Sequence, residues 1–380
     1  MDSHITEVLN VTREASWLPW AVQYFFLIGL SYASFMLTLP YFVFGRAHLE
    51  RLGRLALLAA LACGVAAPVA LLADLHGPGR FYHFYLHFQP RSWMAWGSFF
   101  IPLYLGGLLL YAWLALRPDL AAWGASGRRG ARWYRLAGRG GRASRAALAG
   151  AALLTMCGVL ALALYTGMEV AVVRARPLWH TPFLPAQFVA TAAAGALGLA
   201  LLFNHFIGDR DRRLALALNR ALALTLALVL ALGGGWLYAC LSGLSPVHSA
   251  AFNQMAGAPA WQLSAVWAVL ATVVPMALAV LRPASSGLFN GVVALHSAWM
   301  MRWTIFIGGQ AIPKTGAGWY DYQLPLGSDG LLGIAGTLGL WIVLLIVLLD
   351  YLPWAGANSV RPGPVKPAAR LGAAATPATH

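Results

Sequence analysis

Charged residues are scarce in this sequence. They make up 10% of its 380 residues, whereas 60% are hydrophobic and the mean hydropathy is +0.67. About a quarter of the residues of a soluble domain are charged, so the composition excludes a soluble domain and indicates an integral membrane protein. The alternating apolar and polar pattern of membrane β-strands is also lacking, which argues against a β-barrel.

Cysteine is rare as well. Cys63, Cys157 and Cys240 fall in apolar segments without paired spacing, so neither a disulfide framework nor a zinc site is expected.

The N-terminal segment 1–16 lacks the basic start of a signal peptide, and the first apolar run is too long for a signal core, so no cleavage is expected. Nucleotide-binding loops and hydrolase motifs are missing too, which argues against hydrolytic chemistry.

Long apolar runs recur along the chain, and each can cross about 30 Å of hydrocarbon as a helix. They predict an all-α polytopic membrane protein of about nine transmembrane helices. A first four-helix bundle (17–172) and a second (173–308) are followed by an outer loop (309–329) and one extra C-terminal helix (330–354). The nine predicted spans are 17–44, 55–75, 95–116, 146–172, 186–207, 217–241, 260–281, 288–308 and 330–352.

The distribution of basic residues predicts how these spans are oriented. The formal net charge of +14 would suit a nucleic-acid-binding protein, but the arginines concentrate in every second connection. Eight of them lie in the connection 117–145, which is expected to be flexible and to contact anionic membrane lipid. The positive-inside rule places the N-terminus outside and the Pro/Ala/Gly-rich, disordered tail 355–380 in the cytoplasm. Nucleic acid is therefore not an expected partner.

The predicted outer loops 74–94, 173–185 and 309–329 differ from the plain basic loops on the other side. They are aromatic, stiffened by proline and mixed in charge. Tryptophan and tyrosine favour the boundary between hydrocarbon and water, and the mixed charge predicts a partner or ligand on the outer face. The candidate partner-docking residues are Tyr82, His87, Arg91, Arg176, Trp179 and His180.

Two carboxylates stand at the outer ends of predicted spans, Asp74 at the end of the second and Glu169 at the end of the fourth. Burial of an acid there is costly without a partner. An interfacial ion pair with Arg80, Arg174 or Arg176 is one interpretation. Proton transfer is the other, because a quinol that is oxidised gives up two protons together with its electrons and needs an acceptor for them.

The proton-transfer interpretation depends on depth in the membrane. Antiparallel spans place 20–24, 74–76 and 165–169 at one level, so Trp20 and Tyr24 would face the same outer region as Asp74. Asp74 with His76 could accept the quinol protons and pass them to water, and Glu169 lies at the same depth. Tyr165 could donate a hydrogen bond to a quinone carbonyl. The candidate quinone-binding residues are Trp20, Gln23, Tyr24, Asp74, His76, Arg80 and Tyr165.

Three alternatives stay open at this point. A b-type haem needs two histidines at one depth on facing helices, and only His205 and His296 lie within predicted spans. A transporter would need mid-membrane acids and interrupted helices, which the sequence lacks; a purely structural anchor would bind no quinone. Arg302, near the outer end of the eighth span, is expected to snorkel among tryptophans or to contact a buried carboxylate.

Several short motifs together resemble the NrfD/polysulfide reductase membrane-subunit family. The match is densest after the second span and continues at the end of the fourth and in the eighth span, where it is similar to longer members such as tetrathionate or arsenate reductase membrane subunits. The matching motifs are Asp74-Leu75-x-x-Pro78-x-Arg80-Phe81-Tyr82, His87-Phe88-x-Pro90-x-Ser92, Trp96-Gly97, Tyr165-Thr166-Gly167, Arg176-Pro177-Leu178-Trp179, Met301-Arg302-Trp303 and Gly308-Gly309-Gln310.

The resemblance implies a quinol-binding anchor without haem or iron–sulfur cluster of its own, in the inner membrane of a bacterium. The implied cofactor is menaquinone or ubiquinone. The implied partners, on the outer face, are a four-cluster ferredoxin-like iron–sulfur subunit and a molybdopterin catalytic subunit. Asp74 and Tyr165 match the family's quinone site. The asparagine and histidine of the family's first span are replaced by Ala21 and Tyr24, with Gln23 or Tyr24 as substitute donors.

Overall fold

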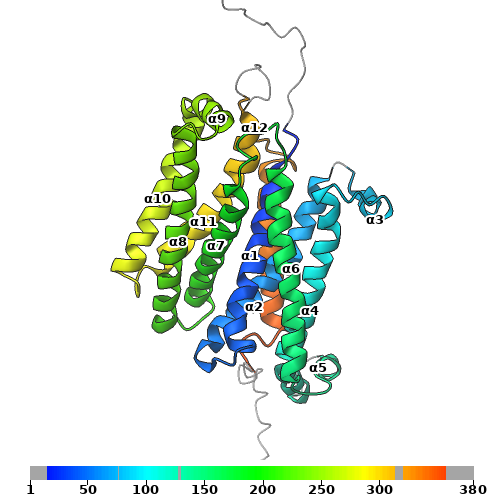
Figure 1. The fold of residues 1–380 in the computed structure, drawn as a ribbon. Helices are drawn as coiled ribbons and strands as arrows, with labels where there is room; N and C mark the ends of the chain where they lie inside the picture. Colours follow the sequence, from blue (N-terminus) through cyan, green and yellow to red (C-terminus); the bar gives the residue numbers. More distant parts are fainter. Residues whose placement is uncertain (1–14, 76, 127–129, 313–319, 357–380) are drawn as a thin grey trace, which may run out of the picture.

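The chain is described by a computed structural model over residues 15–75, 77–126, 130–312 and 320–356. Within these ranges every regular element is a helix and no strand occurs (Figure 1). The predicted all-α class is therefore confirmed. His76 and nearly all of the predicted tail 355–380 lie outside the described residues.

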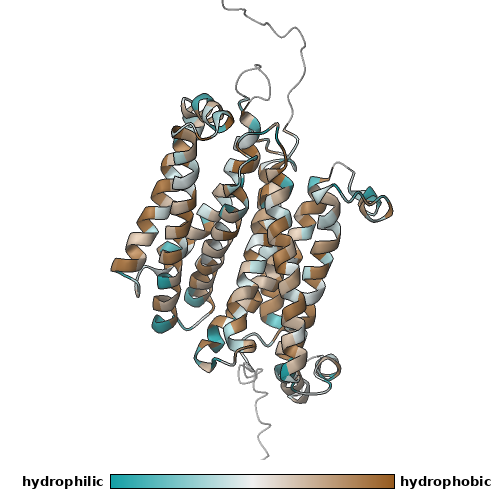
Figure 2. Ribbon diagram, viewed as in Figure 1, coloured by the Kyte–Doolittle hydropathy of each residue, from teal (hydrophilic) through white to brown (hydrophobic). Residues whose placement is uncertain are grey.

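Eight of the helices are long and apolar enough to cross a membrane, and their hydrophobic residues run along most of their length (Figure 2). A further helix, α11 (Gly287–Trp303), is shorter but continues through a π-helical turn, η3 (Thr304–Gly308), into α12 (Gly309–Ala311). The prediction of a multi-pass membrane protein of about nine spans is confirmed. The eight long helices are α1 (Pro19–Phe42), α2 (Glu50–Asp74), α4 (Trp93–Ala125), α6 (Arg145–Ala171), α7 (Phe183–Phe206), α8 (Arg212–Leu241), α10 (Pro259–Leu281) and α13 (Leu331–Tyr351).

Neighbouring helices approach closely where one of them carries glycine. α1 packs on α2 and α4 packs on α6, while α7, α8, α10 and α11 pack together on the other side of α1. A Cβ added to Gly158 of α6 would lie 2.6 Å from the Tyr104 Cα of α4. A Cβ on Gly198 of α7 would lie 2.9 Å from the Gly291 carbonyl oxygen of α11. Small residues that let backbones meet are typical of helix packing in membranes.

The last helix, α13, leans on the first bundle. It packs against α2, and its Gly333 contacts the ring of Trp20. The Trp341 indole N–H donates to the Cys63 thiol at 3.3 Å. Most of α13 is nevertheless exposed, as expected for a helix surrounded by lipid.

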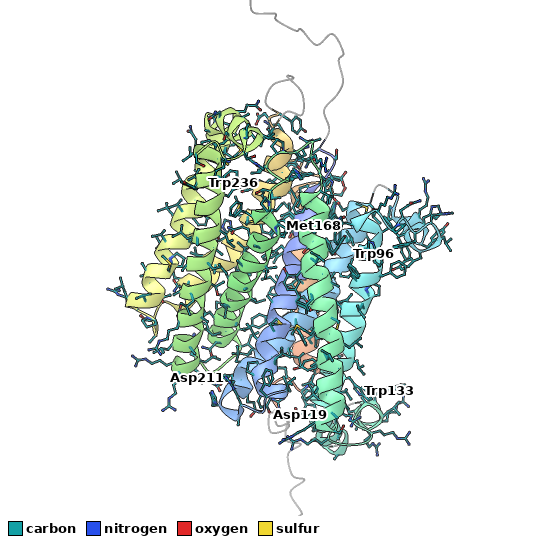
Figure 3. All side chains as sticks on the ribbon, viewed as in Figure 1. Trp96, Asp119, Trp133, Met168, Asp211 and Trp236 are labelled. Atoms are coloured by element: carbon teal, nitrogen blue, oxygen red, sulfur yellow. The ribbon has the colours of Figure 1, made fainter. Side chains whose placement is uncertain are left out.

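The helix group has two ends. We call the end at which α2 and α6 stop and α1 and α4 start the Asp74 face, and the opposite end the Arg54 face. Trp96, Met168 and Trp236 lie toward the Asp74 face, and Asp119 and Asp211 lie at the Arg54 face (Figure 3). Three short helices and two 3₁₀ turns lie near the ends: α3 (His83–Leu86), α5 (Ala131–Ala137), α9 (Pro246–Ala256), η1 (Ala47–Leu49) and η2 (Pro78–Arg80).

The prediction of a flexible connection over 117–145 was wrong for most of its described residues. α4 continues to Ala125, and α5 (Ala131–Ala137) folds back against it (Figure 1). The Arg54 guanidinium of α2 holds the extension of α4 through the Asp119 carboxylate at 2.7 Å, and it also donates to the Pro353 carbonyl at the end of α13. A charge pair that only the folded chain brings together therefore fixes this segment.

Candidate functional site

A cavity of about 570 Å³ opens near the Asp74 face and is lined by residues of α1, α2, α4 and α6. This volume lies within the range of small-molecule sites. Trp17, just before α1, is among the mostly apolar wall residues. The polar lining residues include Asp74, Tyr165 and Glu169, besides Ser16, Tyr85 and Ser98. A largely apolar cavity with a few convergent polar groups is the usual form of a ligand site.

Asp74 is the last residue of α2 and lies next to the start of α1. Its Oδ1 accepts a hydrogen bond from the Leu18 backbone N–H at 3.3 Å, one residue before α1 begins at Pro19. The helix dipole favours a negative charge at such a position. Asp74 is half-buried, so it connects the cavity with the Asp74 face.

Tyr165 and Glu169 come from α6 and lie one helical turn apart, on the same side of the helix. Both are buried, and the phenol of Tyr165 is within electrostatic reach of the Glu169 carboxylate. The Oε2 atom of Glu169 has no hydrogen-bond partner among the described residues. A buried polar atom without a partner is costly, so this atom marks a place where a polar ligand would be stabilised.

Gly97 of α4 forms the wall behind the Tyr165 ring. A Cβ at this position would lie 2.6 Å from the Tyr165 Cε2 and 2.7 Å from its hydroxyl oxygen. Only glycine therefore leaves room for the tyrosine in its observed position. Gly97 was not among the predicted site residues, because nothing in one sequence shows which ring a glycine will face.

The predicted residues of the first span do not line the cavity. Trp20 packs against α13, and the Gln23 Oε1 accepts from the Trp299 indole N–H at 3.4 Å, toward the second bundle. Tyr24 is fully buried, and its hydroxyl lies close to the phenol of Tyr165. Tyr24 thus lies behind the cavity wall, whereas Trp17 and two other residues of this segment, Ala21 and Phe25, line the cavity itself.

Arg80 lies in a second, more open cavity of about 580 Å³. His83 and His87 line it too, and the two cavities share Leu75, Phe81 and Phe84. Arg80 is exposed there and does not line the cavity that holds Glu169 and Tyr165.

The predicted docking residues separate into two groups. Tyr82, His87 and Arg91 are exposed in or beside the segment that carries α3, which extends away from the bundle (Figure 1). His180 is also exposed, with its Nδ1 2.5 Å from the Ala171 carbonyl oxygen. These four residues are accessible to a partner.

Arg176 and Trp179 instead hold the end of the α11–α12 segment. Trp179 is 3% exposed, and its indole N–H donates to the Ile305 carbonyl at 2.5 Å. The Arg176 guanidinium donates to the carbonyls of Gln310 and Ile312 at 2.9 and 3.0 Å, and burial lowers its pKa from the ordinary value. The structure thus buries Trp179 and leaves Arg176 half-buried, with its guanidinium engaged by backbone carbonyls of the same protein.

The two span histidines lie at different depths. His205 is the second-last residue of α7 and packs on Phe206 near the Arg54 face. His296 lies about two and a half turns into α11 and packs on the Trp267 ring at 5.1 Å. A shared haem would need two histidines that face each other at one depth, and His205 and His296 do not meet this condition.

Arg302 differs from both expectations. It is 1% exposed, so it does not snorkel, and its hydrogen bonds go to oxygen atoms that carry no charge. Its Nη1 donates to the Thr191 hydroxyl at 2.5 Å, and its Nη2 donates to the Phe188 carbonyl at 2.8 Å. The α7 backbone and hydroxyl take the place of the predicted carboxylate, because they lie directly across from α11.

The helices and the cavity define a class first: a polytopic α-helical membrane protein with a ligand-sized cavity at one end of its first four long helices. The family model described as "Polysulphide reductase, NrfD" matches residues 7–314, and the chain belongs to this family. The chain is 34% identical to a subunit of the tetrathionate reductase of Salmonella typhimurium, over 92% of this chain and 95% of that protein. It is also 35% identical to a subunit of the selenate reductase of Mesobacillus selenatarsenatis, over 29% of this chain and 26% of that protein.

Proposed function

We propose that this protein is the quinol-binding membrane subunit of a reductase complex and passes electrons between the quinone pool and an iron–sulfur partner subunit. The single observation that carries the proposal is the apolar cavity in which Asp74, Tyr165 and Glu169 meet. The relatives are named as subunits of tetrathionate and selenate reductases, which supports a role as one member of a larger enzyme.

The cavity fits a quinone head group. Its wall is mostly apolar, as a lipid-soluble ring requires, and the unpartnered Oε2 of Glu169 offers a polar contact. Gly97 belongs to the same wall and leaves the room that the Tyr165 ring occupies. Exposed apolar residues of α2 and α4, such as Leu72 and Met94, belong to the same wall, so the cavity borders the lipid from which a quinol would enter.

When bound, a quinol supplies two electrons and two protons. Tyr165 is suited to donate a hydrogen bond to a quinone carbonyl oxygen, which fixes the ring in the cavity. Glu169 is buried and suited to take a proton at its free Oε2. Asp74 is half-buried at the Asp74 face and suited to pass a proton to water.

The Asp74 face is also the proposed partner side. The positive-inside rule favours placing this face outside the cytoplasmic membrane and the arginine-rich Arg54 face in the cytoplasm. Tyr82, His87, Arg91 and His180 are exposed there and would meet the iron–sulfur subunit, to which a molybdopterin subunit binds in turn. The terminal substrate is reduced or oxidised in that partner rather than in this chain.

The test compares Asp74→Asn with Asp321→Asn, a matched change at an exposed acid beyond α12. Both variants are produced in the assembled complex, and oxidation of a soluble menaquinol analogue is measured together with the amount of complex in the membrane. The proposal expects Asp74→Asn to lose turnover while the complex persists, and Asp321→Asn to keep it. Unchanged turnover in Asp74→Asn, or purified wild-type protein that never retains quinone, would contradict it.

A further inference from the structure

The connection between α4 and α6 carries a cationic surface that the quinone site does not use. We call it the α5 arginine surface and define it by Arg117, Arg132, Arg139 and Arg142. Asp119 is the one acid in 117–145, and it is already bound to Arg54 at 2.7 Å. The positive charge of this surface is therefore not neutralised from within its own segment.

Arg117 is held in place at the centre of this surface. Its Nε donates to the Gly141 carbonyl at 2.7 Å, and its Cζ lies 5.3 Å from the ring centre of Trp113. The Trp113 indole N–H is itself fixed on the Ala137 carbonyl at 2.8 Å. These contacts occupy the Nε and one face of the guanidinium and leave its two Nη amino groups as donors.

Gly140, with a φ of +84°, lies beside the same guanidinium: a Cβ placed there would be in ordinary van der Waals contact with the Arg117 Nη1, at 3.7 Å. Neither of these contacts uses an Nη hydrogen, so the two amino groups still point outward along the edge of the group. A planar guanidinium with two amino groups available as donors matches two oxygens of a phosphate. Arg139 and Arg142 directly precede and follow the pair Gly140–Gly141 in the sequence, and both side chains are exposed.

Apolar groups adjoin the charges. Trp113 is 41% exposed one turn before Arg117, and Leu110 is exposed a further turn toward the middle of α4. On α5, Trp133 and Leu136 are exposed as well (Figure 3 labels Trp133). A ligand that fits this surface combines an anionic head group with apolar chains. Surfaces on which tryptophan and arginine lie together are typical of membrane interfaces, where such molecules are found.

We infer that the α5 arginine surface is a binding site for an anionic phospholipid. The phosphate sits on the Nη groups of Arg117 between Arg139 and Arg142, and an acyl chain runs along Trp113 and Leu110. The Tyr134 hydroxyl of α5 donates to the Tyr351 carbonyl of α13 at 3.3 Å. A bound lipid thus fastens α5 and, through it, the end of the exposed helix α13.

The test uses the full-length protein in detergent and counts bound lipids by native mass spectrometry. Phosphatidylglycerol, phosphatidylcholine and inorganic phosphate are added separately, and thermal unfolding is followed in parallel. We expect phosphatidylglycerol to bind more tightly than phosphatidylcholine and to raise the unfolding temperature. Arg117→Gln should weaken phosphatidylglycerol binding about fivefold, the factor for roughly 1 kcal/mol per basic residue at an anionic surface; Arg117→Lys should lie between.

The matched control is Arg212→Gln with Arg213→Gln, two exposed arginines that begin α8 at the same face. The control should bind phosphatidylglycerol like the wild type. Should Arg117→Gln fail to fold, the double variant Arg139→Gln/Arg142→Gln answers the same question. Wild-type binding by these variants, an equal loss in the control, or displacement of the lipid by inorganic phosphate would overturn the inference.

Discussion

Replacing Gly97 by alanine tests whether the position of Tyr165 makes the cavity a binding site. The added Cβ would lie 2.6 Å from the Tyr165 Cε2, much closer than two carbon atoms can approach. Tyr165 is 2% exposed, and α4 and α6 pack directly on each other. The ring therefore has to move toward the cavity or the two helices have to separate.

Two opposing contributions set the size of the effect. Overpacking a tight interior costs about 1–3 kcal/mol, whereas alanine is favoured over glycine inside a helix by roughly 0.5–1 kcal/mol. Gly106, on the same helix, has no atom within 4 Å of an added Cβ. Gly106→Ala should therefore show only the stabilisation that comes from the higher helix propensity of alanine, and it serves as the matched control.

The assay is a titration of the purified protein with menadione, a soluble naphthoquinone, followed by quenching of tryptophan fluorescence. Trp17 lines the cavity and reports on occupancy. If the Tyr165 hydroxyl loses its position, the lost hydrogen bond costs about 1–3 kcal/mol. That loss corresponds to a roughly 5- to 150-fold higher dissociation constant for menadione.

The outcome for Gly106→Ala should be unchanged binding and equal or slightly higher thermal stability. If Gly97→Ala binds menadione as tightly as Gly106→Ala does, the assignment of Tyr165 to the ligand site is refuted. If both variants lose binding equally, the effect comes from helix packing in general and the reasoning fails as well.

Three further predictions concern polar groups elsewhere in the bundle. Tyr165→Phe should weaken menadione binding by about 1–3 kcal/mol in the same titration, with unchanged yield; equal affinity would remove the hydroxyl from the site. Glu169→Gln keeps the shape but cannot accept the proton, so turnover with a menaquinol analogue should fall while menadione still binds; full turnover would exclude Glu169 as acceptor. Arg54→Met leaves the buried Asp119 without its ion-pair partner and should cost about 3–5 kcal/mol of stability in thermal unfolding. Arg51→Gln, which breaks the bond to the exposed Asp209, should change stability by less than about 1 kcal/mol; similar losses in both would show that burial of the Arg54 pair is unimportant.

The predicted spans agree with the helices to within a few residues at most ends, because long apolar runs are local features of the chain. The largest exception is the end of the third span. The predicted third span ended at 116, but α4 runs to Ala125, since Asp119 is paired with Arg54 of another helix. Polar residues near the end of an apolar run look like a loop until the partner that satisfies them is known.

For the candidate site too, some properties could be predicted from the sequence and others could not. Depth could be predicted from sequence, because antiparallel helices of known length bring Asp74, Tyr165 and Glu169 to one level. The rotation of each helix about its axis could not be predicted, so Trp20, Gln23 and Tyr24 were expected in a cavity that they do not line, and Gly97 was missed. The Arg302 side chain was likewise expected either to snorkel or to contact a buried carboxylate, whereas α7 carbonyl and hydroxyl oxygens hold it inside.

The sequence by itself determined that this protein is helical, crosses the membrane many times and concentrates its arginines in every second connection. Those properties depend on composition and on distance along the chain, which the bilayer converts directly into helices and topology. Only the tertiary structure decided which side chains share the cavity and which are buried between helices. That choice depends on helix rotation and on close backbone approach at glycines such as Gly97 and Gly158, and both arise from contacts between residues far apart in sequence.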